Sequence, residues 1–387
     1  MVDFSNFNNF IGKIEGLEKI TAGMLGNSII FAAFWLFLVI ILVPEEYGKL
    51  SYLYAVATIA GVISSLGFNQ VLLVLPAKGE NIQATVYWLG LIASFIVSII
   101  SYVIFNNVSV SLFIIGFAIF NLVYHESLGS KKYNYFIKIA IIQKILLVVF
   151  SLGLYYLIGI DGIILGMFFS FLLPLKQFFC IIKEQKIQKE KIKKHFNFFA
   201  ASYAFDLTKN FTMYLDKIII LPLLGYIILG NYQFSLHVIL FIIIIPTAVL
   251  AYSVPKEAIN ESTNKLKIIT VVFTVILVTI SILFSPILIP ILLPEYVESI
   301  PILQIMVLGA IPLAGSHMLI SKFLALEKII PIIIGSILFI TFQISLIYLL
   351  VSWETIGLSI AFVVASSIEF LFLFIVQKTS INIFSKK

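Results

Sequence analysis

The sequence has few charged residues, a single cysteine and no arginine. Charged residues make up 11% of its 387 residues, whereas a soluble domain carries about 25%. So small a share cannot cover the surface of a soluble globule of this length, which indicates that much of the surface faces lipid. The single cysteine, Cys180, excludes a disulfide bond within the chain.

Motifs for metal and nucleotide chemistry are also missing. The sequence contains no CxxC, no HExxH and no Walker motif, and its four histidines lie far apart, without the spacing of metal ligands. The connections between its apolar runs are too short to hold a soluble catalytic domain. We therefore expect neither a cofactor nor an enzymatic activity.

Long apolar runs dominate instead, and 61% of the residues are hydrophobic. A helix that crosses a membrane needs about 20 mostly apolar residues, and such runs recur along the whole chain. Stretches such as ILFIIIIPTAVLAY are apolar on every face, unlike the alternating segments of a transmembrane barrel. The sequence predicts an all-α polytopic membrane protein of about 12 transmembrane helices in two six-helix bundles. The predicted spans are 21–43, 51–76, 84–105, 109–128, 136–158, 162–182, 198–221, 227–250, 268–293, 300–320, 330–351 and 356–376.

The distribution of charge between these spans predicts the orientation. With the N-terminus in the cytoplasm, most lysines fall in cytoplasmic connections, and only Lys49 falls in an outer loop. The outer loops carry acids instead, among them Glu45, Asp161 and Glu354. This is the positive-inside pattern, so we expect both termini in the cytoplasm. The first twenty residues show no small-residue cleavage site, and we expect the first span to act as the insertion signal.

A lysine-rich connector, 183–195, lies at the midpoint of the chain. It is interpreted either as a cytoplasmic connector that fixes the topology or as a segment that binds lipid or a partner. It separates a predicted N-terminal lobe, 1–190, from a predicted C-terminal lobe, 191–387. A weak repeat at an offset of 193 residues, in which Tyr155 matches Tyr348, suggests that the lobes are related. Paired six-helix repeats are a recurring transporter design.

The seventh predicted span carries four ionisable residues: Asp206, Lys209, Asp216 and Lys217. Ionisable residues inside a span are costly and mark functional sites by default. Asp206 and Lys209 are three residues apart and can pair on one helix face. One interpretation is a helix that lines a hydrated cavity and offers lysines to an anion. The alternative is an ion-pair ladder that stabilises packing, or, for Asp216 and Lys217, a simple anchor at the outer boundary.

Other polar residues in the spans are weaker candidates for the same cavity. Asn27 in the first span and His237 in the eighth are each interpreted either as cavity residues or as packing hydrogen bonds between helices. Glu369, in the middle of the last span, is a candidate protonatable site. The same two interpretations apply to Ser28, Asn69, Gln70, Asn231 and Gln233. For Lys144 the alternative to a functional role is a side chain that snorkels to the interface, and for Glu126 it is a position close to the cytoplasmic edge of the fourth span.

Four stretches together resemble the polysaccharide flippases of the multidrug/oligosaccharidyl-lipid/polysaccharide (MOP) exporter superfamily. They are VPEEYGKLSYLYAVATIAGVISSLGF, GIDGIILGMFFSFL, YLDKIIILPLLGYIILGNYQFS and LLPEYVESIPILQIMVLGAIP. In the third stretch Asp216, Lys217, Gly230 and Tyr232 occupy motif positions. Their order and spacing carry the resemblance, which implies a MATE-like MOP fold. Lysine replaces the arginines that often line the cavity of relatives.

The resemblance implies a flippase for a polyprenyl-pyrophosphate-linked oligosaccharide, such as an O-antigen unit, in the inner (cytoplasmic) membrane. Lys209 and Lys217 would attract the pyrophosphate, with Asp206 and Asp216 holding them in the empty site. Glu369 would couple transport to an ion gradient. The implied partners are the lipid-linked oligosaccharide, membrane lipid, and a polysaccharide polymerase with its assembly proteins; no nucleic acid is expected.

Two other functions remain open at this point. A drug/cation antiporter of the same superfamily would need uncompensated acids that face an aromatic cavity. An integral membrane polysaccharide polymerase or ligase typically carries a long outer loop with catalytic arginines or histidines, and this sequence has no such loop.

Overall fold

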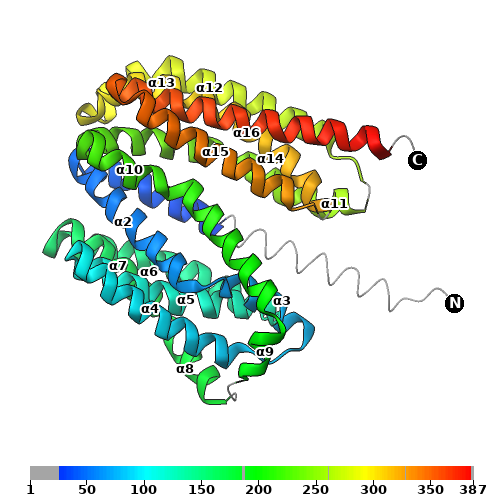
Figure 1. The fold of residues 1–387 in the computed structure, drawn as a ribbon. Coiled ribbons are helices and arrows are strands. Elements are labelled where there is room, and N and C mark those ends of the chain that lie inside the picture. The colour runs from blue at the N-terminus through cyan, green and yellow to red at the C-terminus, as the bar shows by residue number, and fades with distance from the viewer. Residues whose placement is uncertain (1–25, 185–187, 260, 327, 385–387) are drawn as a thin grey trace. The chain divides into compact units, whose positions relative to one another are not determined.

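The computed structural model describes residues 26–184, 188–259, 261–326 and 328–384, and all regular structure in these ranges is helical (Figure 1). Helices are the expected result, because a chain in lipid must satisfy its backbone hydrogen bonds internally. The N-terminal segment, the start of the first predicted span and part of the basic connector lie outside the described residues.

Eight helices in this part of the chain are long and apolar enough to cross a membrane, or up to ten if each of two bent pairs forms one span. The bent pairs are α2 (Pro44–Ser65) with Phe68–Lys78, and α7 (Ile160–Phe171) with Leu175–Lys183. The shorter apolar helix Gly26–Ile41 lies in the first predicted span. The prediction of an all-α polytopic chain is confirmed.

The helix α10 (Phe196–Ile242) contains both the seventh predicted span and the start of the eighth, merged across a kink at Gly225. Gly225 has φ 81° and ψ 179°, a conformation that is essentially restricted to glycine. The hydroxyl of Tyr232 lies 2.7 Å from a carboxylate oxygen of Asp216, 16 residues earlier. A straight helix would separate these residues by about 24 Å, so the chain folds back on itself at the kink.

The chain divides into two compact units, whose three boundaries fall inside the helix Gly26–Ile41, inside α2 and inside α10. Unit 1 comprises the described residues up to Phe31 together with Val56–Asn210, and unit 2 comprises Ala32–Ala55 together with Phe211–Lys387. The second half of the first helix and the first half of α2 therefore belong with the C-terminal helices. The division of the sequence into lobes at residue 190 stays a prediction.

Among the described residues of unit 1, α3, α4, α5, α6, α8 and the start of α10 contribute to an apolar core. In it the ring of Tyr87 stacks on that of Phe178, with centroids 4.9 Å apart. Helices that follow one another in the sequence pack against each other, as α6 and α7 do (Figure 1). The remaining elements of this unit are α3 (Phe68–Val74), η1 (Pro76–Lys78), α4 (Gln83–Phe105), α5 (Val108–Gly129), α6 (Tyr133–Ile158), α8 (Leu175–Glu184) and α9 (Lys189–Lys194).

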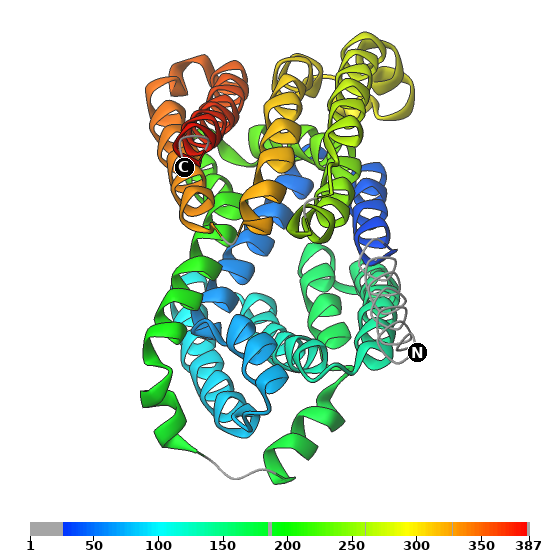
Figure 2. The ribbon, with the colours of Figure 1, turned by 90° about the vertical axis from the view of Figure 1, so that its right-hand side faces the viewer.

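Unit 2 pairs its last two helices, α15 and α16, which run side by side (Figure 2). Large apolar side chains are exposed along α12, among them Ile268, Val272 and Ile276, as expected of a face against lipid. The elements are α11 (Ile244–Ala258), α12 (Asn264–Leu292), η2 (Pro294–Tyr296), α13 (Ser299–Met306), η3 (Val307–Gly309), α14 (Ala310–Ala325), α15 (Ile330–Leu349), η4 (Val351–Trp353) and α16 (Glu354–Phe384).

The described part of the basic connector forms ion pairs with the loop before α4. The His195 ring nitrogen Nε2 lies 3.1 Å from a carboxylate oxygen of Glu80, and Lys194 Nζ lies 3.4 Å from the other. The hydrogen bond with His195 is the main cause that holds the pKa of Glu80 below its usual value. This contact fixes the position of α9 on unit 1.

Candidate functional site

The four ionisable residues of the seventh span all lie on the first part of α10, but they fall in different units. Asp206 and Lys209 belong to unit 1, and Asp216 and Lys217 belong to unit 2. Each pair is therefore considered within its own unit.

Asp216 is the centre of a closed hydrogen-bond network in unit 2. Its Oδ1 accepts from the Lys217 ammonium and from the Lys217 backbone N–H, both at 2.9 Å. Its Oδ2 accepts from the Tyr232 hydroxyl at 2.7 Å, and that hydroxyl oxygen accepts from Gln343 Nε2 at 3.1 Å. Lys217 also donates to the carbonyl of Met213.

All the charged atoms of this network are buried. Asp216 is 4% exposed and Lys217 is 3% exposed, so neither lies at a hydrated boundary as a simple anchor would. A buried charge pair with further hydrogen bonds is stable as long as both charges remain. Because Tyr232 follows the kink and Asp216 precedes it, the network fastens the two parts of α10 together. This geometry fits the ion-pair interpretation, and it leaves the Lys217 ammonium buried against Asp216 rather than exposed to an anion.

Asp206 does not pair with Lys209 in the structure. Its carboxylate Oδ1 accepts instead from Gln70 Nε2 on α3, at 3.3 Å, and Asn69 precedes Gln70 on the same helix. Asp206 is 5% exposed. The local pairing that the spacing of Asp206 and Lys209 suggested is replaced by a contact across 136 residues of sequence.

Lys209 is exposed, and the described residues provide no acid within 4.0 Å of its ammonium. It lies 13 residues after Phe196, about 20 Å along α10. Its charge acts on Asp206 and on His125 of α5. Lys209 is thus a span lysine whose charge is not neutralised by a direct ion pair in this part of the chain.

His237 lies in an aromatic cluster of unit 2. Its Nδ1 is 2.7 Å from the hydroxyl of Tyr47, and its ring stacks on Trp35 with centroids 4.8 Å apart. Tyr47 is fully buried. Beside this cluster, α2 approaches α10 so closely that a Cβ added to Gly230 would lie 1.8 Å from the carbonyl oxygen of Pro44. These contacts give a packing reason for Tyr47 and Gly230, two residues of the motif stretches.

The two remaining candidates are placed apart from these groups. Asn27 is half-buried on the helix Gly26–Ile41, in unit 1. Glu369 is 7% exposed on α16, against Gly335 of α15, and it makes no ion pair with another described residue. The structure thus groups Asn27, Asp206 and Lys209 in unit 1, and the other four candidates in unit 2.

The sequence did not indicate three side chains that contact the candidate residues or their network. Gln343 donates to the Tyr232 hydroxyl, and Tyr47 and Trp35 contact His237. Gln343 was detectable, because an amide in the apolar run of α15 needs a hydrogen-bond partner. For metals, no group of three or more His, Cys, Asp or Glu side chains occurs within the described ranges.

Solved structures share this fold. An inward-facing MATE-family multidrug resistance transporter of the MOP superfamily matches with a TM-score of 0.69 and 14% identity, over 95% of this chain and 96% of that chain. The lipid II flippase MurJ, in an inward closed conformation, matches with a TM-score of 0.74 and 14% identity, over 93% and 87%. A MOP superfamily transporter from Pyrococcus furiosus Vc1 (DSM3638) matches with a TM-score of 0.60 and 14% identity, over 96% of each chain.

The sequence itself matches no family model and no curated protein. The likeness therefore lies in the backbone, along almost the whole length of both partners in each comparison. The chain has the all-helical fold of the MOP superfamily transporters, as the sequence motifs predicted.

Proposed function

We propose that the protein is a flippase that moves a polyprenyl-pyrophosphate-linked oligosaccharide from the cytoplasmic to the outer leaflet. The cargo is an O-antigen unit or a similar repeat unit of a surface polysaccharide. A sugar-pyrophosphate headgroup is too polar to cross about 30 Å of hydrocarbon unaided. The fold shared with a lipid II flippase supports a lipid-linked cargo.

This proposal rests on one observation, the exposed and unneutralised ammonium of Lys209. An exposed lysine in a long apolar helix, with no acid within 4.0 Å among the described residues, is available to an anion. Lys217 lacks this property because Asp216 neutralises it. We therefore assign the pyrophosphate contact to Lys209 and give Lys217 and Asp216 a structural role.

Lys144 of α6 is a second cation available within unit 1. Its ammonium lies 4.2 Å from the centroid of the Phe31 ring, and it has no ion pair with another described residue. A cation is attracted to the face of an aromatic ring, so this contact holds the ammonium in place without an acid partner. We assign Lys144 a second contact with the pyrophosphate, because a pyrophosphate carries more negative charge than one lysine neutralises.

Transport by this fold would proceed by alternating closure of its two sides while the prenyl tail stays in lipid. We place the protein in the inner membrane with both termini in the cytoplasm, on the strength of the lysine distribution. An ion gradient is the expected driver, with Glu369 as one coupling candidate. A polysaccharide polymerase would act on the delivered unit.

A drug/cation antiporter is the second candidate function. It is favoured by Asp206 and Glu369, two buried carboxylates without an ion pair in the described part of the chain. Such a protein would bind an organic cation, whereas the flippase would bind an anion at Lys209. The sign of the bound cargo therefore separates the two functions.

The test is the leaflet location of lipid-linked oligosaccharide in cells that lack the protein. We expect single repeat units to accumulate on the cytoplasmic side and surface polymer to disappear. Wild type and Lys209→Arg should restore both, because arginine keeps the charge, and Lys209→Ala should not. Lys138→Ala is the matched control: this exposed lysine of α6 has no assigned role, so the variant should behave as wild type.

Two outcomes would overturn the proposal. Units that reach the outer leaflet and remain unpolymerised would identify the protein as a polymerase or ligase. Normal surface polymer together with a lost resistance to organic cations would identify an antiporter. Protein levels of all variants are measured in the membrane fraction, so that a lost rescue reports on transport.

A further inference from the structure

Two short helices of unit 1, α8 and α9, bring a group of lysines to one end of the unit (Figures 1 and 2). The Phe178 ring of α8 stacks on the Tyr87 ring of α4. The backbone N–H of Gln188, just before α9, donates to the Thr85 hydroxyl of α4 at 2.8 Å. Because Thr85 and Tyr87 both lie near the start of α4, this end of α4 holds both helices. The sequence 175–195 contains seven lysines and two glutamates.

The helix α8 has two faces of different character. Phe178 and Ile181 are buried in the apolar core of unit 1. Lys176, Phe179 and Lys183 are three and four residues apart, so they share the opposite face, and all three are exposed. A large apolar side chain, 47% exposed between two lysines, is typical of a helix that lies at a membrane surface.

The lengths of α7 and α8 indicate the depth of this exposed face. The 12 residues of α7 span about 18 Å, which is too short to cross about 30 Å of hydrocarbon. After a bend of 45°, the ten residues of α8 continue the path for about 15 Å. With α7 along the membrane normal, α8 adds about 11 Å of depth, so the crossing ends near Lys183. Phe179 then lies about 4 Å inside the hydrocarbon.

Further exposed groups of the same kind follow on α9 and at the start of α10. Lys193 and Lys194 are exposed, and Phe196 is 64% exposed. Two acids lie on or against α9: Glu190 is exposed, and Glu80 already pairs with His195 and Lys194. The positive charge of this end of the unit is therefore only partly neutralised.

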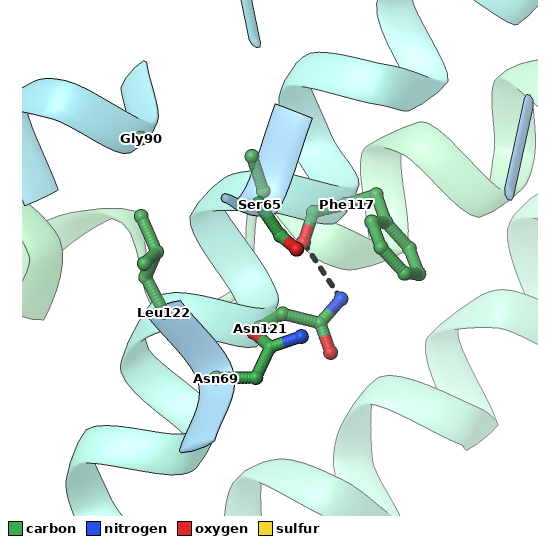
Figure 3. A pocket seen from close by; sticks show the side chains of 7 residues that line it. Ser65, Asn69, Gly90, Phe117, Asn121 and Leu122 are labelled. Atoms are coloured by element: carbon green, nitrogen blue, oxygen red, sulfur yellow. Dashed lines mark hydrogen bonds between the residues drawn. The ribbon is translucent and has the colours of Figure 1, made fainter. Parts of the chain in front are cut away.

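The pocket inside unit 1 offers no place for a phosphate group. Ser65, Asn69, Phe117 and Asn121 are among the residues that line it, and it has room for about one water molecule (Figure 3). Its seven lining residues are all neutral. A phosphate is larger than a water molecule and carries charge, so the exposed lysines of α8 and α9 are the better match.

We propose that the exposed residues Lys176, Phe179 and Lys183 of α8, with Lys193 and Phe196, form a basic surface that binds anionic phospholipids of the cytoplasmic leaflet. The lysines contact the lipid phosphates, and the two phenylalanines pack against the adjoining acyl chains. An acidic protein would match the lysines equally well, but it would leave Phe179 without an apolar neighbour at hydrocarbon depth. Because the other face of α8 packs in the core, the bound lipids hold this end of unit 1 at the level of the headgroups.

The experiment measures which lipid contacts α8 in the purified full chain, reconstituted in vesicles. The reporter is Phe179→Trp, combined with Trp88→Phe and Trp353→Phe, because these two tryptophans are 41% and 58% exposed. The third tryptophan, Trp35, is 2% exposed and is kept. Quenching of its fluorescence is compared between brominated phosphatidylglycerol, which is anionic, and brominated phosphatidylcholine. Each is present at the same mole fraction in phosphatidylcholine vesicles, at low and at high salt.

Three further variants are built on this reporter. Lys176→Gln/Lys183→Gln removes both charges of α8, and Lys176→Arg/Lys183→Arg keeps them. Lys138→Gln is the matched control, because it removes an exposed lysine of α6. A lysine near an anionic surface contributes about a fivefold preference for anionic lipid. We therefore expect the reporter to prefer phosphatidylglycerol at least fivefold at low salt and less at high salt.

The glutamine pair should abolish this preference, whereas the arginine pair and Lys138→Gln should keep it. Equal quenching by the two lipids in the reporter, or a preference that survives in the glutamine pair, would overturn the proposal. Weak quenching by both lipids would also overturn it, and would favour an acidic protein as the partner of the basic surface. Since the vesicles contain no lipid-linked sugar, the result is independent of the proposed transport function.

Discussion

The buried pair of Asp216 and Lys217 predicts an asymmetric response to mutation. Asp216→Asn removes the negative charge and leaves the Lys217 ammonium, 3% exposed, with the Met213 carbonyl and a Tyr214 ring at 5.8 Å. Removal of one partner of a buried ion pair costs about 3–5 kcal/mol, because an uncompensated charge stays behind. We expect Asp216→Asn to destabilise the protein by this amount.

Lys217→Met should cost less, although it removes the other half of the same pair. Asp216 then keeps two donors, the backbone N–H at 2.9 Å and the Tyr232 hydroxyl at 2.7 Å. These two donors partly compensate the buried carboxylate that is left behind, so we expect the loss to stay below about 3 kcal/mol. The double variant Asp216→Asn/Lys217→Met buries no charge, so it should be more stable than Asp216→Asn alone.

Thermal unfolding of the three purified variants in one detergent, followed by circular dichroism, measures this order. The reasoning would be refuted if Lys217→Met were as damaging as Asp216→Asn. It would also fail if the double variant were less stable than Asp216→Asn alone, since the uncompensated lysine would then not be the cause of the loss.

Two further predictions concern packing and pH. Gly230→Ala places a Cβ 1.8 Å from the carbonyl oxygen of Pro44 and should destabilise the protein by about 1–3 kcal/mol. Gly153→Ala, whose Cβ would meet nothing within 4 Å, should stabilise its helix by about 0.5–1 kcal/mol. Equal melting temperatures of the two variants would contradict the packing argument. Because His195 lowers the pKa of Glu80, their contact is fully formed above the ordinary glutamate pKa and is lost as the pH falls through the lowered one. Hydrogen exchange of α9 should therefore accelerate at acidic pH in wild type, whereas Glu80→Gln should show fast exchange without this transition.

The spans were predictable because the physics that defines them is local. Membrane thickness fixes the length of an apolar run, and this needs no knowledge of the rest of the chain. The break inside α10 was equally visible, since Pro222 and Gly225 interrupt the apolar run there. Only glycine reaches the backbone angles found at this kink.

The partners of the polar residues were not predictable in the same way. Helical spacing suggested that Asp206 pairs with Lys209, yet the carboxylate turns to Gln70 on another helix. Spacing reports only on neighbours along one helix, and contacts across 136 residues depend on how helices pack. Asn69 and Gln70 were recognised as unusual for a span, but nothing in their spacing indicates the acid that they face.

The close contact between α2 and α10 has a consequence for biosynthesis. A Cβ at Gly48 would lie 2.0 Å from the carbonyl oxygen of Tyr226, so this face of α2 is shaped for a segment made about 180 residues later. At a synthesis rate of about 5–20 residues per second, the interval is on the order of ten to forty seconds. During that time the newly inserted helix lacks its native neighbour, and the face that carries Gly48 is open to lipid or to other helices.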